Sequence, residues 1–113
     1  MTETLEFTTI DRGSNSDYQE ARVEVITRIE NWRYLWQKHK PNDSVPNVDF
    51  GKYQIVAIFM GQQSSSSYDV EITDVVMNQS GTIDLKVNYS LKGQIIDRPI
   101  VQRPYHIIQM PLS

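Results

Sequence analysis

The chain has 113 residues, the size of one domain, and its 39% hydrophobic and 22% charged residues are typical of a folded globular protein. Its net charge of −3 argues against a nucleic-acid partner. The absence of cysteine excludes disulfide bonds, a thiol nucleophile and thiolate metal sites.

The sequence also lacks the signals of a membrane or exported protein. No stretch approaches the roughly 18 apolar residues that a membrane span requires. The N-terminal residues MTETLEF are acidic, whereas a signal peptide has a basic segment followed by an apolar one. The sequence as it stands therefore predicts a cytoplasmic protein, or an extracytoplasmic one if the chain is a trimmed domain of an exported protein.

The first part of the chain predicts two strands separated by a loop. Residues Leu5–Ile10 form the first expected strand, and the turn-forming residues Asp11–Ser16 predict a loop. Between Ala21 and Val25, apolar and charged residues alternate. This period of two is typical of a half-buried strand, so we expect Val23 and Val25 to face the core.

A short helix is expected next, starting at Thr27. Thr27 and Glu30 have the spacing of a capping box, in which the two side chains satisfy backbone amides at a helix start. Trp32 and Trp36 fall on one apolar stripe, and Pro41 prevents the helix from continuing. We therefore expect both tryptophans to anchor the helix onto a sheet.

The rest of the chain predicts four more strands. A break in the alternation at Val75 predicts a bulge near Asp74, and Asn78–Gly81 predicts a hairpin turn. The expected fold is mainly β, an antiparallel β-sandwich or open barrel of about six strands with one short helix packed against it. We expect a single domain over residues 1–113. The four strands are Tyr53–Met60, one that begins at Tyr68, Ile83–Leu91 and Val101–Met110.

Neither histidine is expected to form a metal or catalytic site. His39 and His106 lack the close spacing of metal ligands. His39 lies at the end of the apolar stripe of the helix, and His106 in the last strand is interpreted as a half-buried histidine with satisfied hydrogen bonds. A Ser/His/Asp site built from Ser67, His106 and Asp69 is conceivable, but its serine lacks the Gly-x-Ser-x-Gly turn.

The carboxylates give no stronger signal for an enzyme. Asp69 and Glu71 share a strand face about 6.6–6.8 Å apart, a separation that glycosidases also use. Acidic residues on the solvent face of a sheet are the simpler interpretation. Because no glycine-rich loop opens a helix, no phosphate cradle is expected either. We therefore expect no catalytic residue, no cofactor and no metal.

Five short motifs follow one another along the chain: Trp32–Trp36 (WRYLW), Pro46–Phe50 (PNVDF), the strand Ile55–Gly61, Tyr68–Ile72 (YDVEI) and Pro104–Ile108 (PYHII). In this order and approximate spacing they resemble the C-terminal domain of the PrcB protease-complex subunit family. The resemblance extends over about residues 25–111.

The resemblance implies a non-enzymatic, β-rich module. The namesake of the family is an accessory lipoprotein that stabilises a secreted subtilisin-like protease and joins its complex. No catalytic residue is carried over from the family. We expect the motif residues to maintain the fold; they are Trp32, Leu35, Trp36, Pro46, Asp49, Phe50, Gly61, Pro104, Tyr105 and His106.

We expect the chain to bind another protein, such as a protease. The expected surface is the serine-rich loop after the Tyr53–Met60 strand, with the neighbouring loops Pro41–Asp49 and Lys92–Gln102, because loops held by a rigid sheet often carry binding. Two other classes stay open: a protease inhibitor-like domain, and a small-ligand or carbohydrate-binding sandwich that uses exposed tyrosines, Tyr34, Tyr53 or Tyr68. The loop residues are Gln62, Gln63, Ser64, Ser65, Ser66, Ser67 and Tyr68.

Overall fold

The computed structural model describes residues 3–62, 68–80, 82–91 and 102–112. Seven strands and one helix lie in this part of the chain. In chain order they are β1 (Glu3–Leu5), β2 (Thr8–Gly13), β3 (Ala21–Ile26), α1 (Ile29–His39), β4 (Tyr53–Met60), β5 (Tyr68–Met77), β6 (Ile83–Leu91) and β7 (Tyr105–Pro111).

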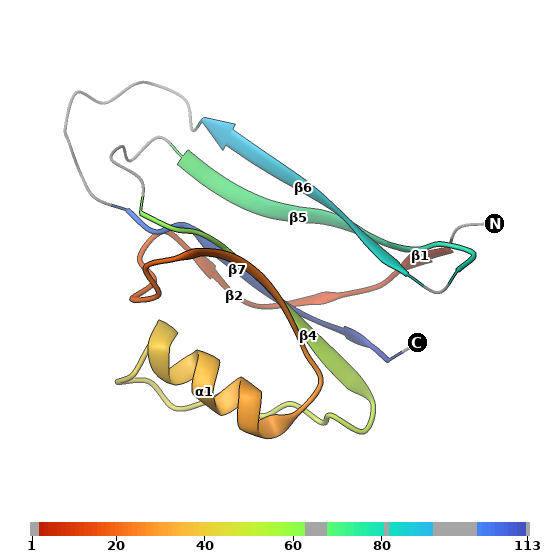
Figure 1. Cartoon of the computed structure of the whole chain (residues 1–113), viewed down its shortest axis with the longest axis horizontal. Coiled ribbons are helices and arrows are strands. Elements are labelled where there is room, and N and C mark those ends of the chain that lie inside the picture. Colours follow the sequence, from red (N-terminus) through yellow and green to blue (C-terminus); the bar gives the residue numbers. More distant parts are fainter. Residues whose placement is uncertain (1–2, 63–67, 81, 92–101, 113) are drawn as a thin grey trace.

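The strands form two antiparallel sheets stacked as a sandwich. One sheet has the order β1-β5-β6 and the other β2-β7-β4-β3. Figure 1 shows the first sheet above the second, with α1 below it. Within the described residues the sheets do not close into a barrel. The predicted mainly β fold with one packed helix is thus confirmed, in its sandwich form.

The strand β4 separates two hydrophobic cores. Its residues from Gln54 to Phe59 are all buried. Because side chains alternate between the faces of a strand, Ile55, Ala57 and Phe59 face α1, while Val56 and Ile58 face the other sheet. We call these the helix core and the inter-sheet core. Strand β7 divides in the same way, with Tyr105 and Ile107 in the helix core and Ile108 and Met110 in the inter-sheet core.

The helix packs as expected but begins later than expected. Trp32 and Trp36 are buried in the helix core. The N-cap residue is Arg28, in an extended conformation and without a side-chain capping bond. The predicted capping box of Thr27 and Glu30 is therefore wrong. Strand β3 runs on to Ile26, so the chain is still extended where the cap was expected.

Strand β3 lies where the alternation predicted it, but the expected burial of its valines is wrong. Val23 and Val25 are 54% and 57% exposed. They share a face with Ile58 and Val56 of the paired strand β4. No residue of β3 contributes to the inter-sheet core among the described residues, because the three-stranded sheet does not cover this edge of its partner.

The N-terminal segment also differs from expectation. The single strand predicted over Leu5–Ile10 is two strands in different sheets, because β1 pairs with β5 and β2 pairs with β7. The chain crosses between the sheets at Glu6 and Phe7. Strand β2 then continues to Gly13, into the segment expected to be a loop.

The hairpin of β5 and β6 contains the predicted bulge. The register shifts between Ile72 and Asp74, which allows Val75 to be buried on the same face as Ile72. At the turn, the Asn78 side chain accepts two backbone N–H groups, consistent with the predicted hairpin. Gly81 lies outside the described residues.

Candidate functional site

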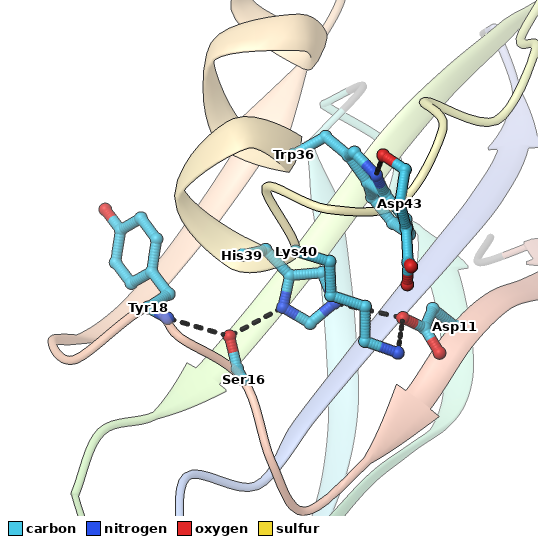
Figure 2. A network of polar contacts seen from close by, with 7 residues as sticks. All are labelled: Asp11, Ser16, Tyr18, Trp36, His39, Lys40 and Asp43. Atoms are coloured by element: carbon cyan, nitrogen blue, oxygen red, sulfur yellow. Dashed lines mark hydrogen bonds and ion pairs between the residues drawn. The ribbon is translucent and has the colours of Figure 1, made fainter.

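A buried polar network surrounds His39 at the C-terminal end of α1 (Figure 2). His39 and Ser16 are both 0% exposed. The Nδ1 atom of His39 lies 2.6 Å from Ser16 Oγ, and its Nε2 atom lies 3.0 Å from Asp11 Oδ2. The ammonium group of Lys40 lies 3.0 Å from the same carboxylate oxygen. The network therefore joins β2, the segment after it and the end of α1.

The hydrogen bonds define one neutral tautomer of His39. A carboxylate only accepts hydrogen bonds, so Nε2–H donates to Asp11. In a neutral ring Nδ1 is then an acceptor, and the Ser16 hydroxyl donates to it. The Ser16 oxygen in turn accepts the backbone N–H of Tyr18 at 3.0 Å. Every polar atom in this chain of bonds has a partner of the right kind.

Contacts of the backbone also position Ser16, independently of the His39 side chain. The Ser16 N–H donates to the Arg103 carbonyl, while the Arg103 guanidinium donates to the Ser16 carbonyl. The N–H of Asp17 donates to the His39 carbonyl at 3.0 Å. The segment after β2 is therefore held both by Arg103, which precedes β7, and by the end of α1.

Aromatic rings enclose the imidazole. The centroids of Trp36, Phe59 and Tyr105 lie 5.1, 5.6 and 4.2 Å from that of His39, all in edge-to-face arrangements. The Tyr105 hydroxyl also interacts with Asp11 and Lys40. His39 therefore lies in an apolar enclosure that leaves its two nitrogens only the partners described above.

This environment shifts the pKa of the titratable side chains in the network. Burial lowers the pKa of His39 below its usual value, although Asp11 acts in the opposite direction. Burial would raise the pKa of Asp11, but hydrogen bonds from His39 and Lys40 outweigh it and lower that pKa. The hydrogen bond to Tyr105 is the largest cause that raises the pKa of Lys40. The neutral imidazole and the ionised carboxylate are thus the favoured forms.

The order of groups resembles that of a serine hydrolase: a serine hydroxyl donates to a histidine, which donates to an aspartate. The surroundings differ. A nucleophile must reach its substrate, whereas Ser16 and His39 are fully buried. Sequence reasoning missed Asp11, Ser16 and Lys40. The position of His39 on the apolar stripe indicated its burial. Its partners Ser16 and Asp11 lie 23 and 28 positions away in the sequence, so no local pattern indicated them.

The Ser/His/Asp site considered from the sequence has a different centre. His106 is 2% exposed in the inter-sheet core. Its Nδ1 accepts the backbone N–H of Ile72 at 2.9 Å, so Nε2–H donates to Thr9 Oγ1 at 2.8 Å. The prediction of satisfied hydrogen bonds agrees with this geometry, whereas the expected half-burial is wrong, because His106 lies between the two sheets. Ser67 and the side chain of Asp69 lie outside the described residues.

Glu71, one of the two carboxylates considered above as a glycosidase pair, forms an ion pair. Its Oε2 lies 3.4 Å from the Arg12 guanidinium, and the Arg12 Nε donates to the Val70 carbonyl at 3.2 Å. Arg12 is opposite His106 in the register of β2 and β7. These two neighbouring side chains therefore link the two sheets.

The expected binding loop is described only at its ends. Gln62 is exposed after β4, and Tyr68 begins β5. Gln63, Ser64, Ser65, Ser66, Ser67 and the side chain of Tyr68 lie outside the described residues, as do residues 92–101 of the neighbouring loop.

The loop Pro41–Asp49 lies against α1, held by the two tryptophans. The Trp36 indole donates to the Asp43 carbonyl at 3.1 Å, and that of Trp32 donates to Pro46 at 3.0 Å. At the end of the loop, Asp49 Oδ1 accepts the N–H of Gly51. The remaining motif residues are also in packed positions. Leu35 and Tyr105 are buried in the helix core, and Phe50 packs against it. Pro104 is fully buried, and its carbonyl accepts the N–H of Met60 in β4.

The other expectations concern ligands and membranes. In the described ranges, no three His, Asp or Glu side chains are grouped as metal ligands would be. Tyr34 is 63% exposed beside Lys38 on α1, whereas Tyr53 lines a depression with Leu5 and Phe7. No helix in the described part of the chain has the length and apolarity needed to cross a membrane.

The fold is thus a two-sheet β-sandwich, and one helix covers the outer face of its larger sheet. The family model described as PrcB C-terminal matches residues 54–111, just over half of the chain. The chain belongs to this family. The match contains Gly61, Pro104, Tyr105 and His106, whereas the motifs of α1 and of the loop after it precede it. No curated protein and no solved structure gave a significant match.

Proposed function

We propose that this chain is a non-enzymatic protein-interaction module that acts as an accessory or stabilising subunit of a protease complex. Membership of the PrcB C-terminal family supports the association with a protease complex. The observation that carries the non-enzymatic part is the enclosure of Ser16 and His39, both 0% exposed. Their hydrogen bonds fasten α1 to the sheet and serve the fold.

The proposed contact surface is the end of the sandwich where β4 stops. Ala21 pairs with Met60 at this end. Gly61 then turns the chain with a φ of 73°, and a Cβ at this position would lie 2.8 Å from the Ala21 nitrogen. Glycine is needed for so close an approach. The loop that starts at Gln62 thus leaves from a fixed base, as binding loops commonly do.

Affinity capture with the tagged full chain, from native lysate and secreted fraction, tests this function by mass spectrometry. We expect specific recovery of a protease. Replacing Gln62–Ser67 with a short turn should lower recovery about tenfold and leave thermal unfolding unchanged. Ser80→Ala, in the turn at the other end of β5, is the control and should recover as much as the wild type. Equal recovery by the loop variant would place the contact elsewhere, and recovery of no protease would contradict the function.

A second measurement separates the proposed module from an inhibitor and from an enzyme. The recovered protease should keep its activity, and keep it longer, with the chain bound, whereas an inhibitor-like domain would lower that activity. A fluorophosphonate probe should not label the purified chain. Labelling that disappears in Ser16→Ala would show a reactive serine and overturn the non-enzymatic proposal.

A further inference from the structure

Strand β3 lies at one edge of the four-stranded sheet. Among the described residues no strand pairs with it beyond β4, and its pairing with β4 is regular from Ala21 to Ile26. Exposed edges are usually guarded by short strands, bulges or charges. Strand β1 has three residues, and β2 contains a register shift. Strand β3 has neither feature. Its two charges, Arg22 and Glu24, are opposite in sign and pair with each other, and it carries two exposed valines, Val23 and Val25.

The backbone direction of β3 follows from the ladder. The Met60 N–H donates to the Pro104 carbonyl on the β7 side. Successive residues of an antiparallel strand direct their N–H and C=O groups to opposite sides, so Phe59 directs its groups toward β3. Its partner Arg22 directs its own back toward β4. Val23 and Val25 therefore direct their N–H and C=O groups to the free edge.

The sequence of β3 is complementary to itself in one antiparallel register. Edge-to-edge pairing of two copies about a two-fold axis places side chains of the same face opposite one another. With Val23 opposite Val23 of the second copy, Arg22 faces the second copy's Glu24. A shift of one register step in either direction brings together two arginines or two glutamates, which is unfavourable. Arg22 and Glu24 already pair at 2.7 Å within one strand, so the four charges alternate in sign.

We propose that two copies of this chain associate edge to edge through β3, with Val23 on the two-fold axis. The two larger sheets then join into one continuous sheet. Val25 lies beside the second copy's Ala21, which reduces the exposure of the apolar face. Strand β6 offers a similar charge pattern in Asp84 and Lys86, but its apolar face already packs in the inter-sheet core. Pairing through β3 therefore removes more exposed apolar surface from water.

Charge reversal combined with sedimentation equilibrium tests this interface. We expect the wild-type chain to be dimeric at about 1 mM protein and to dissociate as it is diluted, since weak association is measurable at such concentrations. Arg22→Glu and Glu24→Arg should each weaken dimerisation about tenfold, because each places like charges opposite one another. An equimolar mixture of the two variants should form a heterodimer. In that mixture two carboxylates of one chain face two guanidinium groups of the other.

The mixture separates association from folding. Both single variants lose the pair within the strand, and mixing cannot restore it, so heterodimer formation reports only contacts between chains. Lys86→Glu on β6 is the matched control and should dimerise as the wild type does. A wild-type chain that stays monomeric at the highest concentration would overturn the proposal. A dimer that resists both β3 reversals, or that Lys86→Glu disrupts, would assign the interface to another edge.

Discussion

His39 is a buried histidine whose two hydrogen bonds fit the neutral ring. Its Nδ1 accepts from Ser16 while its Nε2–H donates to Asp11. A proton added at Nδ1 would force the Ser16 hydroxyl to give up its role as donor inside the core. Removing a partner from a buried polar group costs about 1–3 kcal/mol. This geometry and the lowered pKa of His39 point in the same direction.

The free energy of unfolding should therefore depend on pH through His39. Because its pKa is lower in the folded state than the usual 6.5, the unfolded chain takes up the proton first as the pH falls. The contribution of His39 is thus complete above about pH 6.5 and is lost progressively below it. Asp11, whose pKa is also lowered, loses its contribution only at lower pH, below its usual 3.8. Urea unfolding between pH 8 and pH 5 measures the first effect.

His39→Gln isolates this contribution. The variant should lose about 2 kcal/mol of stability at pH 8, because the buried hydrogen bonds of the imidazole are broken. Its stability should fall less towards pH 5, because the amide takes up no proton in this range. Gln37→Ala is the control: it changes an exposed residue of the same helix and should keep the wild-type dependence of the unfolding free energy on pH. An unchanged slope in His39→Gln would contradict the assignment.

At the scale of elements, His106 joins the two sheets at the bulge of β5. Its ring accepts the Ile72 N–H, which lies at the register shift of β5. His106→Leu fills the same space with an apolar group but leaves that buried N–H without its acceptor. We expect a loss of about 2 kcal/mol and faster hydrogen exchange at the Ile72 amide, measured by NMR.

Thr9→Val is the matched control for this contact. It removes only the hydroxyl that accepts the Nε2–H of His106, on an exposed residue of β2, and keeps the bond to Ile72. The loss should stay below about 1 kcal/mol, with Ile72 exchange unchanged. If both variants behaved alike, the bond across the sheets would contribute nothing specific.

The same elements show how much the sequence could predict. Alternation located β3, and an apolar run with no polar interruption located β4, because both patterns reflect local backbone geometry. The pattern in β3 could not predict that Val23 and Val25 are exposed, because their burial depends on whether the other sheet extends over β3. The change of sheet between β1 and β2 was missed because no glycine, proline or other turn-forming residue separates the two strands. His39 and Ser16 are 23 positions apart, so no local pattern could pair them.

At the scale of the whole molecule, the two cores should unfold together because β4 and β7 belong to both. Both tryptophans of the chain lie in α1, so their fluorescence reports on the helix core. Val56 lies in the inter-sheet core. Val56→Ala should lower stability by about 2 kcal/mol and shift the fluorescence and circular dichroism midpoints equally.

Val45→Ala is the control for Val56→Ala. This valine is 38% exposed in the loop after α1, and its truncation should change stability by less than about 0.5 kcal/mol. A fluorescence midpoint that stays in place while the circular dichroism midpoint shifts in Val56→Ala would show two independent cores.

The double burial of β4 has a consequence for how its alignment is determined. A displacement by one residue would exchange Ile55 and Ala57 for Val56 and Ile58, and both cores would still receive aliphatic side chains. Hydrophobicity in the middle of β4 therefore says little about where the strand should stop. The boundaries supply that information, since Gln54 donates to the Pro111 carbonyl and Gly61 alone tolerates the close turn. Strand β4, buried on both faces, is thus aligned by its two ends.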